Sequence, residues 1–110
     1  MVAASSAAST SETQRSVRAI ARTERWVAGV DGAELADTIA RYFLDVAPPI
    51  LVAACRRYKA LGIWNETPVL SRAGYQRLFD SLRSGGFVDP GTPFETAVDN
   101  GLAEEVVAAA

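Results

Sequence analysis

The chain has 110 residues, of which 49% are hydrophobic, and its formal net charge is −2. Such a length allows one domain at most, with one modest core. The slightly acidic balance gives no field that attracts nucleic acid or anionic lipid, and the lack of histidine removes the commonest metal ligand and the usual acid–base residue near neutral pH.

The N-terminal residues 1–10, MVAASSAAST, contain neither the basic region nor the long apolar region of a secretory signal. No stretch of the chain approaches the roughly 20 apolar residues that span a bilayer. We therefore expect no membrane insertion, and a cytoplasmic location if the chain is expressed as written. The Ala/Ser-rich residues 1–10 are expected to be a flexible lead-in to a helical module over residues 11–110.

The first expected helix covers residues 11–30, with Thr10 or Ser11 as its N-cap. Its apolar positions share one face, and four arginines line the opposite side: Arg15, Arg18, Arg22 and Arg25. Glu24 falls among the apolar positions, so we expect it to meet a basic partner or to lie at the rim of the contact. The arginines could bind phosphate or an acidic partner, but the amphipathic pattern favours a solvated face.

The second expected helix begins at a capping box formed by Asp31 and Glu34 and ends before Asp45. Pro48 and Pro49 cannot continue that helix, but they suit the first turn of a third one. The third helix ends at Gly62, and the buried face expected for it consists of Ile50, Leu51, Ala54, Cys55, Tyr58 and Leu61. The basic group Arg56, Arg57 and Lys59 lies near its C-terminus, where cations are favourable.

Residues 63–70 form an irregular link, after which Ser71 caps a fourth helix that Gly85 and Gly86 terminate. The core stripe expected for this helix is Tyr75, Leu78, Phe79 and Leu82. A short extended piece and a turn follow over residues 87–91. The last helix begins in a capping box over residues 92–95 and uses Phe94, Val98, Leu102 and Val106, with Gly101 as a weak point in its middle. The pattern thus predicts an all-α protein of about five short helices.

Trp64 and Asn65, in a loop next to Tyr58, are the best candidates for ligand contact, because aromatic residues in loops on a rigid scaffold often line pockets. A lone tryptophan can equally fill a gap between helices. Cys55 lies on an apolar stripe and should be a buried, inert side chain. The sequence offers no nucleophile with a base, no metal-ligand spacing and no phosphate-binding loop, so we expect no enzyme activity, no metal and no cofactor.

An ordered set of short segments resembles the C-terminal end of a family of solute-binding proteins. The segments are residues 22–27 (RTERWV), 41–46 (RYFLDV), 55–64 (CRRYKALGIW), 68–75 (PVLSRAGY), 85–87 (GGF), 93–95 (PFE) and 98–100 (VDN). The family comprises the binding components of ABC importers for nitrate, sulfonates such as taurine, and thiamine precursors, and the likeness covers residues 15–107.

The resemblance implies a periplasmic or extracytoplasmic protein whose partners are a small anionic or heterocyclic solute and an ABC permease. In the family, this helical tail packs against two α/β lobes, which this sequence lacks, so the chain by itself is not expected to bind the solute. The first hypothesis is therefore a solute-binding protein's tail. The second is a free-standing helical interaction module, which could also self-associate, and the third, a helix-turn-helix DNA binder, is disfavoured by the acidic balance.

Overall fold

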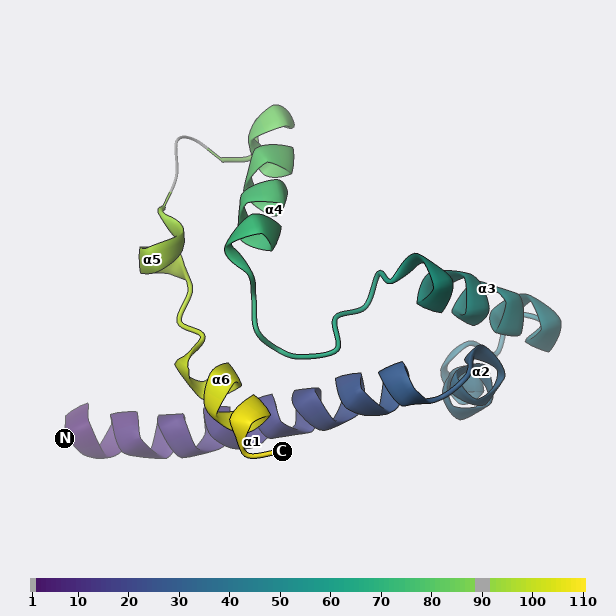
Figure 1. Cartoon of the computed structure of the whole chain (residues 1–110), viewed down its shortest axis with the longest axis horizontal. Coiled ribbons are helices and arrows are strands. Elements are labelled where there is room, and N and C mark those ends of the chain that lie inside the picture. The colour runs from purple at the N-terminus through teal and green to yellow at the C-terminus, as the bar shows by residue number, and fades with distance from the viewer. Residues whose placement is uncertain (1, 89–91) are drawn as a thin grey trace. The chain divides into compact units, whose positions relative to one another are not determined.

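In a computed structural model of the chain, which describes residues 2–88 and 92–110, every regular element is a helix (Figure 1). The prediction of an all-α fold is therefore confirmed. The chain forms two compact units, residues 1–68 and residues 69–110. That residues 11–110 act as one helical module stays a prediction. Each unit is described below by itself.

Unit 1 contains three α-helices and a short 3₁₀-helix: α1 (Val2–Gly29), α2 (Gly32–Ile39), η1 (Ala40–Tyr42) and α3 (Pro48–Leu61). Unit 2 contains α4 (Arg72–Ser84), α5 (Phe94–Ala97) and α6 (Gly101–Ala108). The turn predicted at residues 89–91 lies outside the described residues.

Helix α1 begins at Val2, so the N-cap expected at Thr10 or Ser11 is wrong. Alanine has the highest helix propensity of all residues, and residues 2–28 contain neither glycine nor proline to interrupt the helix. The polar run that suggested a cap therefore lies inside the helix. The flexibility expected of residues 1–10 stays a prediction.

Helices α2 and α3 pack against each other and form the core of unit 1. The buried residues of this core are Leu35, Ala36, Leu51 and Cys55. Around them pack the partly buried Val27, Val30, Ile39, Ala40, Val46 and Val52. Cys55 is buried among these apolar side chains, as predicted.

The helix boundaries in unit 1 agree with the sequence signals. The Asp31 carboxylate accepts a 2.8 Å hydrogen bond from the backbone N–H of Glu34, which caps α2. Pro48 and Pro49 occupy the first turn of α3, and Gly62 ends that helix in the left-handed conformation, with φ of 65°.

The buried face of α3 is narrower than the sequence predicted, because Ile50 (63% exposed), Leu61 (61% exposed) and Tyr58 are exposed. For Ile50 and Leu61 the cause is their angular position: successive residues of an α-helix are turned by about 100°, so Ile50, which directly precedes the buried Leu51, lies to the side of the buried face, and Leu61 lies to the same side. Helix α2 therefore covers the face of α3 that carries Leu51 and Cys55, four positions apart, and leaves the side that carries Ile50 and Leu61 exposed.

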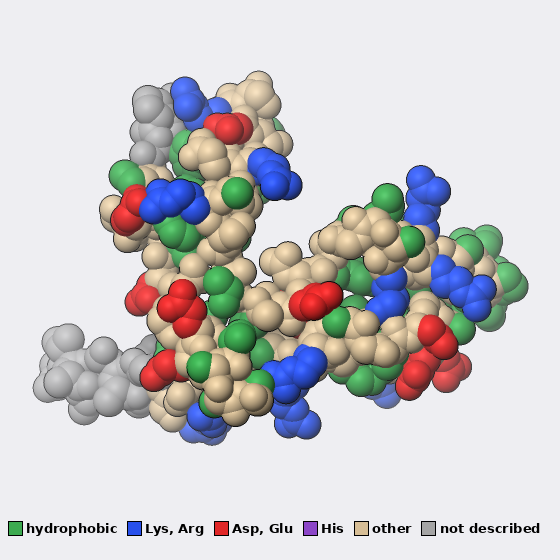
Figure 2. Space-filling model, in the orientation of Figure 1, with side chains coloured by type: hydrophobic (Ala, Val, Ile, Leu, Met, Phe, Trp, Pro, Cys, Tyr) green, Lys and Arg blue, Asp and Glu red, His purple; other side chains and the backbone are tan. Residues whose placement is uncertain are grey.

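The second predicted helix also ends earlier than expected. Its α-helical part stops at Ile39, and a 3₁₀ turn continues only to Tyr42, so Phe43 lies outside the helix and is exposed. Figure 2 shows green hydrophobic side chains at the surface of the part of unit 1 that contains α2 and α3.

In unit 2, an aromatic cluster joins α4 to α5. Tyr75 stacks on Phe79 with 5.7 Å between ring centroids and meets Phe94 edge-on at 5.6 Å. Arg72 lies over the Phe94 ring and pairs with Glu95, and this hydrogen bond lowers the pKa of the Glu95 carboxyl. Helix α4 is capped at Ser71 as predicted.

Two predictions for unit 2 are corrected by the structure. Leu78, expected in the core stripe of α4, is exposed. The last predicted helix is split into α5 and α6, and its first N-cap is Pro93 rather than Thr92. The break is held by Asn100, whose side-chain amide bonds both the N–H and the carbonyl of Leu70, at 2.9 and 2.8 Å, and Gly101 begins α6 after it.

Candidate functional site

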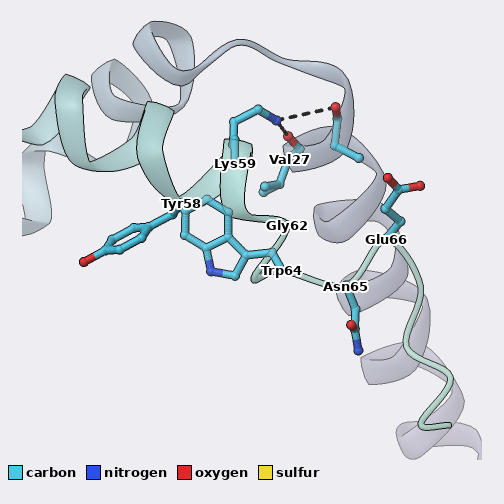
Figure 3. Close-up of a pocket in the computed structure, with 8 residues that line it drawn as sticks. Val27, Tyr58, Lys59, Gly62, Trp64, Asn65 and Glu66 are labelled. Carbon is cyan, nitrogen blue, oxygen red and sulfur yellow. Dashed lines mark hydrogen bonds between the residues drawn. The ribbon is translucent and has the colours of Figure 1, made fainter. Parts of the chain in front are cut away.

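The structure brings the three residues proposed from the sequence to one small pocket of unit 1 (Figure 3). Tyr58, Trp64 and Asn65 line a cavity of about 200 Å³. The other lining residues are Val27, Ala28, Lys59, Gly62 and Glu66. The pocket therefore lies between the C-terminal end of α1, the C-terminal end of α3 and the loop that follows α3. A ligand-binding role for the three residues stays a prediction.

The end of α3 positions Trp64. The backbone N–H groups of Gly62 and Ile63 donate to the carbonyls of Lys59 and Tyr58, at 3.1 and 3.4 Å. With Gly62 in the left-handed conformation, these bonds reverse the chain after the helix. As Figure 3 shows, the Trp64 ring then lies beside Tyr58, with 5.8 Å between centroids and 78° between the ring planes. This edge-to-face geometry is one that aromatic pairs prefer.

Lys59 ties α3 to the C-terminus of α1, a role that the sequence did not indicate. Its ammonium group donates hydrogen bonds to the backbone carbonyls of Val27 and Ala28, the latter at 3.4 Å (Figure 3). The last carbonyls of an α-helix have no partner within the helix, and a cation is favourable at that end of the helix dipole. Lys59 therefore closes α1 and forms one wall of the pocket.

Replacing Lys59 with Met should lower the free energy of unfolding of unit 1 by about 1–2 kcal/mol, because hydrogen bonds from a charged donor to two carbonyls are lost. Urea unfolding followed by circular dichroism measures the change. Arg57→Met is the matched control, since Arg57 lies on the exposed side of the same helix. Equal losses in the two variants would show that the contact with α1 contributes nothing.

A second, larger groove also borders the loop that contains Trp64. It has a volume of about 550 Å³ and is lined by Thr23, Glu24, Val27, Leu35, Ile39, Ile63, Trp64 and Asn65. Val27, Trp64 and Asn65 thus line both cavities. The walls of the larger groove come from α1, α2 and the loop after α3, and most of them are aliphatic or aromatic.

Glu24 is the residue whose position in the sequence pattern was unexpected. Its Oε1 atom is shielded from solvent and has no hydrogen-bond partner among the described residues, and the structure supplies no basic partner there. Loss of solvation raises the pKa of the Glu24 carboxyl, because the charged form is disfavoured where water is displaced. The sequence already marked Glu24 as unusual, because it is a carboxylate on the apolar face of its helix.

The four arginines of α1 line neither of these two cavities. All four are exposed, in agreement with a solvated face: Arg15, Arg18, Arg22 and Arg25. Within residues 2–88 and 92–110, no three His, Cys, Asp or Glu side chains gather in a way that could hold a metal ion. None of the helices over those residues is both long and apolar enough to cross a membrane.

Comparison of the chain with protein-family models, with curated protein sequences and with solved structures gives no match.

Proposed function

We propose that the chain is a helical binding module without catalysis of its own, which acts as the C-terminal tail of an ABC importer's solute-binding protein. In this role its helices pack against α/β lobes that bind a small anionic or heterocyclic solute outside the cytoplasm and deliver it to a permease. The chain itself supplies a docking surface rather than the complete solute site.

The observation that carries the proposal is the number of large apolar side chains that unit 1 leaves uncovered. Ile50 and Leu61 lie near the two ends of α3, and Ile63 follows the Gly62 cap of that helix. Scattered exposed leucines are ordinary, but a group of aliphatic and aromatic side chains on one short helix and its flanks is typical of a surface that another protein covers. The buried core beside them consists of four residues.

The proposed partner, the α/β lobes of a solute-binding protein, is inferred from the ordered segments that resemble that family. Several of them fall on the uncovered part of the surface: residues 41–46 lie at the end of η1 and in the turn after it, and residues 55–64 include the exposed Tyr58, Leu61 and Trp64. The family's tail uses its helices to contact the lobes. The same segments in this chain carry side chains that unit 1 does not bury.

Reconstitution with the two-lobe part of a sulfonate- or nitrate-binding protein, from which the natural tail has been deleted, tests the proposal. We expect the purified chain to bind these lobes in isothermal titration calorimetry and to raise their melting temperature, because docking removes apolar surface from water on both sides. The double variant Ile50→Gln/Leu61→Gln should lose the binding while it keeps its helix content, since both side chains are exposed in the free chain.

Arg57→Gln, on the same helix, is the matched control and should bind as the unaltered chain does. Failure of the unaltered chain to bind lobes from the nitrate, sulfonate and thiamine-precursor branches alike would overturn the assignment to this family.

A second candidate is a free-standing helical interaction module, and the packing of unit 1 is the observation that favours it. Leu35, Ala36, Leu51 and Cys55 form a core between α2 and α3 that needs no other chain. A module of this kind would fold by itself and use the same uncovered side chains to bind a different protein or a second copy. A chain that stays monomeric and exposes no apolar surface in solution would contradict this candidate and the first one alike.

A further inference from the structure

The larger groove of unit 1 carries one charge in apolar surroundings. Among the described residues that line it, five are aliphatic or aromatic, and Glu24 is the only charged one. Its volume of about 550 Å³ falls within the range of roughly 300–1,000 Å³ that is usual for small-molecule sites. Apolar walls with a single polar anchor are the common composition of such sites.

The Glu24 carboxylate lacks the partner that its position requires. Its Oε1 atom has lost contact with solvent without gaining a hydrogen bond in the described part of the chain. Partial loss of solvation disfavours the ionised form of this carboxyl, so a positive charge close to it would be favourable. Only Oε1 is shielded in that way, so a cation bound in the groove would pair with the carboxylate through its other oxygen and would favour the charged form that loss of solvation now disfavours.

Trp64 supplies a second group that attracts cations. Its ring borders the same groove and is held by the edge-on contact with Tyr58, while part of its surface remains accessible. The face of an indole ring attracts a cation within about 6 Å of its centroid, more strongly when water is excluded. The groove is therefore lined by a carboxylate and by an aromatic residue, the two kinds of group that recognise ammonium ions.

We propose that this groove is a binding site for a small organic monocation with an apolar body, of the arylalkyl- or alkylammonium class. The cationic head would pair with Glu24 beside Trp64, and the apolar body would lie against Val27, Leu35 and Ile39. A divalent metal ion does not fit, because Ca²⁺ and Mg²⁺ require about six oxygen ligands and these walls are mostly hydrocarbon. This site goes beyond the proposed docking function and does not depend on it.

Three probes of one shape and different charge test the proposal: phenethylammonium, 2-phenylethanol and 3-phenylpropionate. Their binding is followed by calorimetry and by tryptophan fluorescence in a Trp26→Phe background, in which Trp64 is the only remaining tryptophan of the two in the chain. We expect phenethylammonium to bind at least about tenfold more tightly than the neutral alcohol, consistent with a charge-assisted contact, and the anion to bind most weakly.

Glu24→Gln should abolish the preference for the cation and leave the weak binding of the alcohol unchanged. Glu66→Gln is the matched control: it removes the same charge from an exposed residue that lines the smaller pocket but not the groove. Equal affinities of the unaltered chain for the cation and the alcohol would overturn the proposal, and so would equal losses in the two variants. Because the first comparison requires no substitution at Glu24, a folding defect in that variant cannot hide the result.

Discussion

Replacing Leu35 with Ala should destabilise unit 1 by about 3 kcal/mol, within the range of about 2–5 kcal/mol for a buried leucine. Leu35 is 4% exposed and is one of the four residues that form the core between α2 and α3. The loss combines the transfer free energy of the removed methyl groups with the cost of the cavity that they leave. Thermal and urea unfolding, followed by far-ultraviolet circular dichroism, measure the change.

Leu44→Ala is the matched control, because Leu44 is 89% exposed and lies between η1 and α3. Its truncation removes little buried surface and should change stability by about 0.5 kcal/mol or less. Equal losses of stability in the two variants would show that the packing of Leu35 between α2 and α3 does not stabilise unit 1.

Replacing Gly32 with Ala should cost about 2 kcal/mol, because there is no room for a Cβ atom where α2 meets α3. A Cβ atom at this position would lie 2.5 Å from Arg56 Cγ, 2.8 Å from the Arg56 backbone nitrogen and 2.9 Å from Arg56 Cα. The side chain of Arg56 can move, but the backbone of α3 can yield only if the two helices separate. Overpacking of this kind typically costs about 1–3 kcal/mol. The melting temperature and the urea midpoint of the variant report the loss.

Gly29→Ala provides the comparison, because a Cβ atom at Gly29 meets nothing within 4 Å. This substitution lies at the end of α1 and should be neutral or stabilising by up to about 1 kcal/mol, since alanine restricts the unfolded chain more than glycine does. A Gly32→Ala variant as stable as Gly29→Ala would mean that α2 and α3 do not approach as closely as the structure has them.

The parts of the fold that the sequence predicted are those that depend on local chemistry. Asp31, Ser71, the proline pair at residues 48–49 and Gly62 mark helix ends because each satisfies or removes a backbone group within a few residues. Burial was predicted less well, because it depends on which element covers a face and over what length. Helical periodicity placed Ile50 and Leu61 on a broad apolar stripe, but it could not indicate that α2 buries only the narrower strip that carries Leu51 and Cys55.

The residues that line the pocket were likewise predicted only where local features of the sequence indicate them. The loop position and side-chain size of Trp64 identified one wall, and Tyr58 and Asn65 do line the same pocket. The hydrogen bonds from Lys59 to Val27 and Ala28 join residues more than thirty positions apart, so no local pattern could reveal them. The break before α6 has a similar origin, because Asn100 bonds to the distant backbone of Leu70.

Whether the uncovered apolar side chains of unit 1 form a docking surface is tested most directly by the behaviour of the purified chain in solution. Binding of the dye ANS and sedimentation equilibrium should be measured over a series of chain concentrations, for the unaltered chain and for Ile50→Gln/Leu61→Gln. If they form such a surface, the unaltered chain should show ANS fluorescence and reversible association, and both should be reduced in the double variant with no loss of helix content. A chain that stays monomeric and binds no ANS at the highest attainable concentration would contradict the presence of a docking surface.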